Sequence, residues 1–173
     1  MEAIKFLEPY LAAYGVTALF VLVYLESLGA PLPGETAIIA ASALAAEGQL
    51  SLPYLLVAIF AGAVLGDSTG YGIGRIGGHR VLSRYGPYFK LTAERLEKLE
   101  ALFRSRGVYI VMTARFVVLL RQLSGILAGS VRMSWWQFLP ANVAGAAAWT
   151  LVWGAGPYLS VHLLQPPLKS WSL

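Results

Sequence analysis

Long apolar blocks interrupted by a few charged residues constrain the fold of this 173-residue chain more than any other feature. Hydrophobic residues make up 57% of the sequence and charged residues 13%, whereas about a quarter of a soluble domain is charged. The apolar residues form long blocks instead of the short alternating runs of a water-facing core. We therefore expect an all-α integral membrane protein.

Two apolar blocks near the N-terminus are too short to cross a bilayer. A simple span needs roughly 20 apolar residues, but the block at 11–25 meets Glu26 and then a proline- and glycine-rich stretch that ends at Glu35. Because proline removes backbone donors and glycine permits turns, the helix should break there. A short interfacial helix is expected before this block, at 2–9. The second half-length block, at 36–46, indicates a re-entrant or discontinuous element.

The C-terminal part repeats this plan. The apolar block at 108–120 carries Arg115 and ends at Arg121, and the next block is again short. A longer apolar block follows each broken pair, at 52–78 and at 135–164, and the latter is long enough for one tilted span. Paired interrupted segments at corresponding positions point to the binding site of a transporter. We therefore predict a polytopic protein of two inverted halves, each with a re-entrant or broken helix plus transmembrane helices.

A basic segment separates the two halves. Between residues 80 and 106, seven Lys or Arg face three Glu, which favours the cytoplasmic side and contact with anionic head groups. Thr92 is expected to cap an amphipathic helix that lies flat on the membrane surface. We divide the single membrane domain, 1–173, into a first half at about 10–78, a linker at about 79–107 and a second half at about 108–165.

Composition excludes several classes of site. The chain has no cysteine and only two histidines, far apart in the sequence, so we expect no metal site and no cofactor. The basic segment lacks the recurring aromatic residues of a nucleic-acid platform, so we expect no nucleic-acid partner.

Six charged residues lie in or at the edge of the apolar blocks: Glu26, Glu35, Asp67, Arg75, Arg115 and Arg121. A charge at the bilayer centre costs about 2.5–3.5 kcal/mol on insertion scales, so acids and bases should pair. A carboxylate in a poorly hydrated cavity takes up a proton more readily than in water, and the planar guanidinium group suits bidentate capture of phosphate. We expect the two glutamates to handle protons and Arg115 and Arg121 to bind a phosphorylated lipid, with Asp67 and Arg75 in support.

Three other functions stay open on the same residues. The charges could form permanent ion pairs that fix how the halves dock in a non-transporting membrane scaffold. The acids could instead bind a small cation in a proton-coupled transporter. An intramembrane serine hydrolase is the remote alternative, because residues 66–70 match a nucleophile elbow that would pair Ser68 with His79 or His162, yet the strand-turn-helix context is missing. We expect no enzyme activity.

Several motifs, in order along most of the chain, resemble those of the DedA family, whose eukaryotic relatives are lipid scramblases that share the VTT domain. They are Glu26-x-x-Gly29-x-Pro31-x-Pro33-Gly34-Glu35, Gly66-Asp67, Tyr71-x-x-Gly74-Arg75-x-x-Gly78, Arg115-Phe116, Arg121, Ala128-Gly129, Met133, Phe138, Asn142, Gly145 and Trp149. One feature departs from the family pattern, because the family commonly has a proline between the two arginines. Here the intervening stretch has none, so the second break is expected to be gentler or displaced toward Ser124-Gly125.

The resemblance implies a polytopic membrane protein with two opposed re-entrant elements. It also implies lipid transport, with undecaprenyl phosphate and phosphatidylethanolamine as family substrates and the proton motive force implicated. The family's functional acids match Glu26 and Glu35, and its functional arginines match Arg115 and Arg121. We therefore expect a multi-pass flippase of the prokaryotic inner membrane, with membrane lipid and protons as partners, and leave open whether it forms a homo-oligomer.

Overall fold

The computed structural model describes residues 2–85 and 92–164, and this part of the chain is helical, with short connections and no strand. The all-α prediction is therefore confirmed. The helices are α1 (Glu2–Ser27), α2 (Gly34–Ala46), α3 (Leu52–Tyr85), α4 (Ala93–Ala114), α5 (Val118–Ser130), α6 (Trp135–Thr150), the π-helical turn η2 (Leu151–Ala155) and α7 (Gly156–Leu164).

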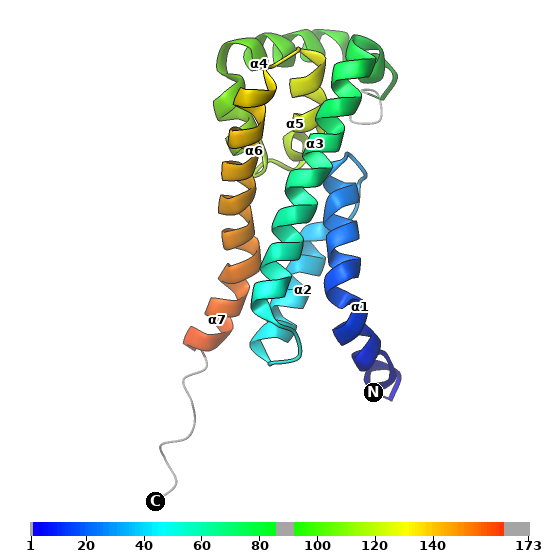
Figure 1. Cartoon of the computed structure of the whole chain (residues 1–173), viewed down its shortest axis with the longest axis vertical. Coiled ribbons are helices and arrows are strands. Elements are labelled where there is room, and N and C mark those ends of the chain that lie inside the picture. Colours follow the sequence, from blue (N-terminus) through cyan, green and yellow to red (C-terminus); the bar gives the residue numbers. More distant parts are fainter. Residues whose placement is uncertain (1, 86–91, 165–173) are drawn as a thin grey trace, which may run out of the picture.

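Two broken helix pairs lie along a frame of long helices (Figure 1). The helix α3 runs the length of the molecule, and α6 with η2 and α7 runs along it in the opposite direction. The first pair, α1 and α2, occupies the lower part of the view. The second pair consists of the end of α4 and α5, and α5 occupies the upper part. The first part of α4 crosses the upper end. The connections within both pairs come at about mid-height, where they can bring their charged residues together.

The first break falls where proline and glycine predict it. α1 ends at Ser27, and α2 begins at Gly34 after a turn in which Gly29 has a φ of 118°. This left-handed conformation suits glycine because it has no Cβ. The separate interfacial helix expected at 2–9 is wrong, because α1 is continuous from Glu2. The single proline there removes only one intrahelical hydrogen bond.

The second break lies at Arg115–Val117, so its displacement toward Ser124 and Gly125 is wrong. The amides of Phe116 and Val117 bond back to carbonyls three residues earlier and close a tight turn. Gly125 lies inside α5 instead. A Cβ there would collide with the Asp67 carbonyl of α3, so the glycine permits close helix packing and does not mark a turn.

α3 is the long helix on which the site is built. Its glycines 66, 70 and 74 lie one turn apart and approach backbone atoms of α1 and α5. Among the described residues, Leu52–Gly78 is the one helix long and apolar enough to cross a membrane, whereas the apolar helices Tyr14–Ser27 and Gly34–Ala46 are shorter. Gly78 then kinks α3, with a φ of 53°.

α4 has two parts. Thr92 caps its start, as predicted, by accepting a hydrogen bond from the Arg95 amide. Arg106 has non-helical dihedral angles, and this residue separates the segment at 93–105 from the segment at 107–114. The sequence also predicts a turn at residues 85–87 and a helix end at the proline pair 166–167, and most of these residues lie outside the part of the chain that the structure describes.

Two apolar cores lie on either side of the charged residues. One includes Tyr71, Val111, Leu127 and Phe138 from α3, α4, α5 and α6. The other includes Val23, Ile38, Ile59, Ala63 and Trp149 from α1, α2, α3 and α6. Since Asp67 lies between Ala63 and Tyr71 on α3, the polar cluster occupies the boundary between these cores.

Candidate functional site

Arg121 joins the two broken pairs. Its Nη2 donates to Glu26 Oε1 at 2.7 Å and its Nη1 donates to Glu35 Oε1 at 2.6 Å. One guanidinium group in α5 thus holds a carboxylate from each side of the first break. Charge-assisted bonds of this kind are about twice as strong as neutral ones. The Gly34 amide also donates to Glu26 Oε1, at 3.3 Å, which fixes the start of α2 against the end of α1.

Trp149 completes the surroundings of Arg121. The guanidinium carbon lies 5.1 Å from the centroid of the indole ring, within cation–π range. Trp149 itself is fully buried in the core shared by α1, α2, α3 and α6. The aromatic face therefore stabilises a positive charge in an apolar setting without neutralising it.

Arg115 forms a second, separate centre. Its Nη2 donates to Asp67 Oδ2 at 2.7 Å, to Asn142 Oδ1 at 2.5 Å and to the Ala63 carbonyl at 3.1 Å. Both side chains of the ion pair have no solvent exposure. The Asn142 amide nitrogen donates to the Val64 carbonyl at 3.1 Å, so this residue links Arg115 to α3 through both ends of its amide.

Sequence reasoning left the partners of the charged residues open, and the structure assigns them. Arg121 takes both glutamates, and Arg115 takes Asp67. Arg75 lies eight residues after Asp67 on α3, which is about 12 Å along the helix at 1.5 Å per residue. Its Nη1 donates to the Met133 carbonyl at 3.3 Å, so it braces the α5–α6 connection outside the cluster.

Access to the cluster is uneven. The side chains of Glu26 and Arg121 are 4% and 2% exposed, whereas that of Glu35 is 32% exposed. Glu35 is therefore the member of the Arg121 centre that reaches solvent or lipid. Several buried polar atoms of the described residues also have no hydrogen-bond partner, namely Asp67 Oδ1, Nε and Nη1 of Arg115, and Nε of Arg121. These atoms leave donor and acceptor capacity inside the site.

Formal charge in the cluster does not balance. Three carboxylates, Glu26, Glu35 and Asp67, face two guanidinium groups. One bound proton would make the cluster neutral. The excess negative charge belongs to the Arg121 centre, where one guanidinium group faces two carboxylates and the Glu35 side chain is 32% exposed.

Asn142 and Trp149 were not among the predicted site residues. They lie seven residues apart on α6, which is two turns along one face of the helix. Asn142 contacts Arg115, and Trp149 contacts Arg121. A lone asparagine among the apolar residues of α6 is the sequence signal that indicates a buried polar partner, since an unpaired amide there is costly.

Ser68 has a local hydrogen bond. Its hydroxyl donates to the Val64 carbonyl, one turn earlier on α3, at 2.6 Å, as serines inside membrane helices commonly do. The His162 ring stacks on Tyr158 of the same helix, α7. Within residues 2–85 and 92–164, no group of three acidic, histidine or cysteine side chains is placed to hold a metal ion.

The buried ion pairs, the apolar helices and the two broken helix pairs are typical of a helical membrane protein. The VTT domain model matches residues 32–156, most of the chain and nearly all of the site. The protein belongs to the DedA family of VTT-domain membrane proteins, which confirms the resemblance seen in the motifs.

Similar proteins include several that are named membrane proteins. An uncharacterized membrane protein of Synechocystis sp. is 40% identical over 150 residues, covering 87% of this chain and 69% of that protein. An uncharacterized membrane protein of Mycobacterium tuberculosis is 38% identical over 153 residues, covering 86% and 69%. The protein DedA of Escherichia coli is 30% identical over 174 residues, covering 94% and 78%. No solved structure matches the chain significantly.

Proposed function

We propose that this protein moves a phosphorylated lipid, such as undecaprenyl phosphate or a phosphatidylethanolamine-like phospholipid, across the bilayer. The observation that carries the proposal is the Arg121 centre, in which one buried guanidinium group is held by carboxylates from both sides of the first break. Intramembrane charge usually marks a substrate or ion pathway, because a fixed charge in hydrocarbon is expensive.

Arg121 is the proposed first ligand of the lipid phosphate. Both of its terminal nitrogens already bind carboxylate oxygens, at nitrogen–oxygen distances of 2.6 and 2.7 Å, and a charge-assisted bond to a phosphate oxygen has a similar length. A phosphate could therefore replace one carboxylate without changing the geometry of the fork. Arg115 is the proposed second ligand. It is held by Asp67 and Asn142 in this conformation, so its engagement requires the second broken pair to move.

Glu35 is the proposed proton acceptor, with Glu26 as its inner partner. It is the exposed carboxylate of the Arg121 centre, and the cluster carries one negative charge in excess. Protonation of Glu35 would remove its charge, weaken its bond to Arg121 and release Nη1 for a phosphate oxygen. Loss of the proton would restore the ion pair and expel the phosphate. Proton binding and lipid binding are thereby coupled at one guanidinium group.

The two broken pairs supply the proposed means of alternating access. We place the protein in the inner membrane as a multi-pass protein, with two inverted halves whose breaks meet near the bilayer midplane and with α4 on the cytoplasmic face. Rocking of one broken pair against the other would expose the Arg121 centre to opposite faces while the acyl chains stay in lipid. Oligomerisation of the protein is compatible with this cycle and is not required by it.

The test is lipid translocation by the full chain in liposomes. A fluorescent phospholipid in the inner leaflet becomes accessible to an added quencher only after it has crossed the bilayer. We expect the intact protein to accelerate this crossing and Arg121→Gln to reduce the rate to that of protein-free liposomes. Glu35→Gln should abolish the response of the rate to an imposed pH gradient.

Arg95→Gln is the matched control, since it removes an exposed arginine of α4 that is not part of the charged cluster. It should keep the translocation rate. Thermal unfolding in detergent establishes that each variant is folded. A folded Arg121→Gln protein that moves lipid at the full rate would refute the proposal, whereas cation flux without lipid movement would favour the small-cation alternative.

A scaffold role is the second candidate, favoured by the complete burial of the Arg115–Asp67 pair. A purely structural pair tolerates replacement by apolar residues of similar volume. The scaffold therefore predicts that Arg115→Met combined with Asp67→Leu preserves the cellular phenotype of the intact protein. A transporter should lose function in the same variant.

A further inference from the structure

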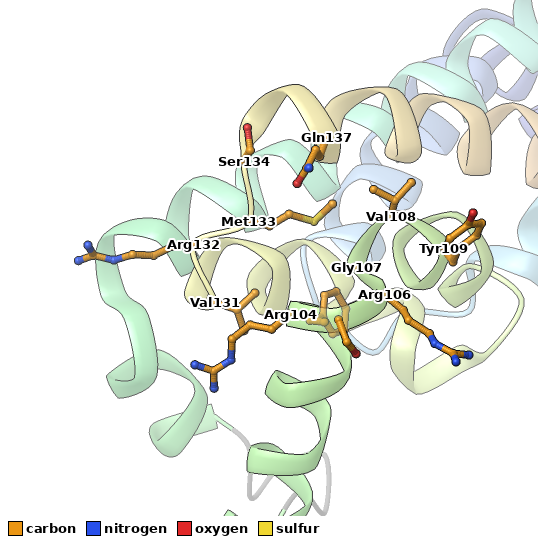
Figure 2. A pocket seen from close by; sticks show the side chains of 12 residues that line it. Arg104, Arg106, Gly107, Val108, Tyr109, Val131, Arg132, Met133, Ser134 and Gln137 are labelled. Atoms are coloured by element: carbon orange, nitrogen blue, oxygen red, sulfur yellow. The ribbon is translucent and has the colours of Figure 1, made fainter.

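A basic pocket lies at the end of the molecule where α4 crosses the other helices, away from the charged cluster. It has a volume of about 370 Å³ and is formed where the kink of α4 meets the α5–α6 connection. Arg104, Arg106 and Arg132 line it, together with Ser134 and Gln137 (Figure 2). Arg106 is nine residues from Arg115, about 13 Å along α4 at 1.5 Å per residue.

The labelled arginine side chains point in different directions in Figure 2. They therefore do not form a clamp for one small anion. They surround the pocket as separate positive groups and suit an array of negative charges, such as phosphates at a membrane surface. All three residues are exposed.

Apolar side chains of α4 and of the α5–α6 connection also line the pocket, between the arginines. Val108, Tyr109, Val131 and Met133 contribute to it. Trp136, at the start of α6, is 81% exposed, and Tyr109 is 72% exposed. Exposed tryptophan and tyrosine side chains are typical of the membrane–water interface. A site with basic and apolar parts fits a lipid, which has both, better than a soluble anion.

Contacts with α3 and α4 hold the α5–α6 connection, which forms one wall of the pocket. The Met133 carbonyl accepts hydrogen bonds from the Tyr71 hydroxyl at 2.6 Å and from Arg75 Nη1 at 3.3 Å. A Cβ on Gly107 would lie 3.2 Å from Met133 Sδ, so α4 also approaches the connection closely. The α5–α6 connection is therefore a fixed wall, and Arg75 braces it.

Arg132 is in a backbone conformation that is unfavourable for arginine. It has a φ of 57° and is the only non-glycine residue with positive φ among the described residues. It follows the C-terminus of α5, and its amide bonds to the Gly129 carbonyl at 3.0 Å. Glycine is the usual residue at such a helix end. An arginine at this position points to a use for its side chain that offsets the strain.

We propose that this pocket is a binding site for an anionic phospholipid, in which the pocket takes the head group and the three arginines pair with its phosphate and with those of neighbouring lipids. The site would hold one lipid at the membrane surface and would thereby fix the position of α4 relative to the lipid head groups. The inference does not depend on lipid translocation, because it concerns a bound surface lipid and a pocket separate from the Arg121 centre.

The experiment measures lipid retention by the full chain in detergent, using native mass spectrometry with phosphatidylglycerol and phosphatidylcholine in equal amounts. The intact protein should keep phosphatidylglycerol preferentially. Each arginine near an anionic surface is worth roughly fivefold in affinity. Arg104→Gln, Arg106→Gln and Arg132→Gly together should therefore reduce the preference by about a hundredfold on the same scale.

Three comparisons decide the result. Arg95→Gln, on the same helix and outside the pocket, should keep the preference, and an equal loss there would assign the effect to the general surface charge and overturn the proposal. Inorganic phosphate should not displace the lipid, and displacement would assign the pocket to a free anion instead. Arg132→Gly alone should lower lipid preference without lowering the thermal midpoint, because glycine relieves the strain. Unchanged lipid preference in a folded Arg132→Gly protein would also contradict the proposal.

Discussion

The pairing of Arg115 with Asp67 predicts a strong energetic coupling between the two side chains. The pair is fully buried, with 2.7 Å between Nη2 and Oδ2, and Arg115 also holds Asn142. Arg115→Met leaves the Asp67 carboxylate with only Ser124, at 3.4 Å. Removing one partner of a buried pair costs about 3–5 kcal/mol, because the other charge stays buried. Asp67→Asn should likewise be destabilising.

Asp67→Asn in the Arg115→Met background should recover much of this loss, because the remaining amide carries no charge. We therefore expect a coupling free energy of about 2–3 kcal/mol in the double-mutant cycle. The measurement is the free energy of unfolding in detergent for the four proteins of the cycle. The control cycle combines Arg115→Met with Glu35→Gln, which share no hydrogen bond, and should be additive within about 0.5 kcal/mol. Additive effects in the Arg115–Asp67 cycle would refute the assignment of these partners.

Further predictions concern the stability of single variants in the same unfolding assay. Gly125→Ala should destabilise the protein by about 1–3 kcal/mol, since its Cβ would meet the Asp67 carbonyl, whereas Gly72→Ala, with no atom near its Cβ, should be neutral or slightly stabilising. Glu26→Gln should cost about 1.5–3 kcal/mol, and Glu35→Gln, with a third of its side chain exposed, about 1 kcal/mol or less. Arg132→Gly should stabilise the fold by about 1 kcal/mol by removing a positive-φ arginine. Three results would contradict the packing described: equal losses for the two glycine variants, equal losses for the two glutamate variants, or destabilisation by Arg132→Gly.

The helical class and the first break could be predicted because both depend on local chemistry. Backbone groups in lipid must be satisfied within a helix, and the proline and glycine between Ser27 and Gly34 end one. The second break has no such residues. Its position at Arg115–Val117 depends on tertiary contacts, since Arg115 is held by α3 and α6. Gly125 was read as a turn signal, but its role is to let α5 approach α3.

The members of the charged cluster could be chosen from the sequence, but not their pairing. Composition and burial indicate that Glu26, Glu35, Asp67, Arg115 and Arg121 need partners. Which acid meets which base depends on how α5 and the break before it pack against α1, α2 and α3, and glycine contacts let α5 approach α3 closely. The amino-acid pattern of one chain carries no signal for this packing.

The central claim is that an arginine after the second break lies between carboxylates from both sides of the first. A crystal structure of the protein grown in lipid tests it most directly. The account predicts that Arg121 will bind both Glu26 and Glu35 with nitrogen–oxygen distances below about 3.2 Å. Finding the two carboxylates apart, each hydrated in the head-group region and out of reach of Arg121, would contradict it.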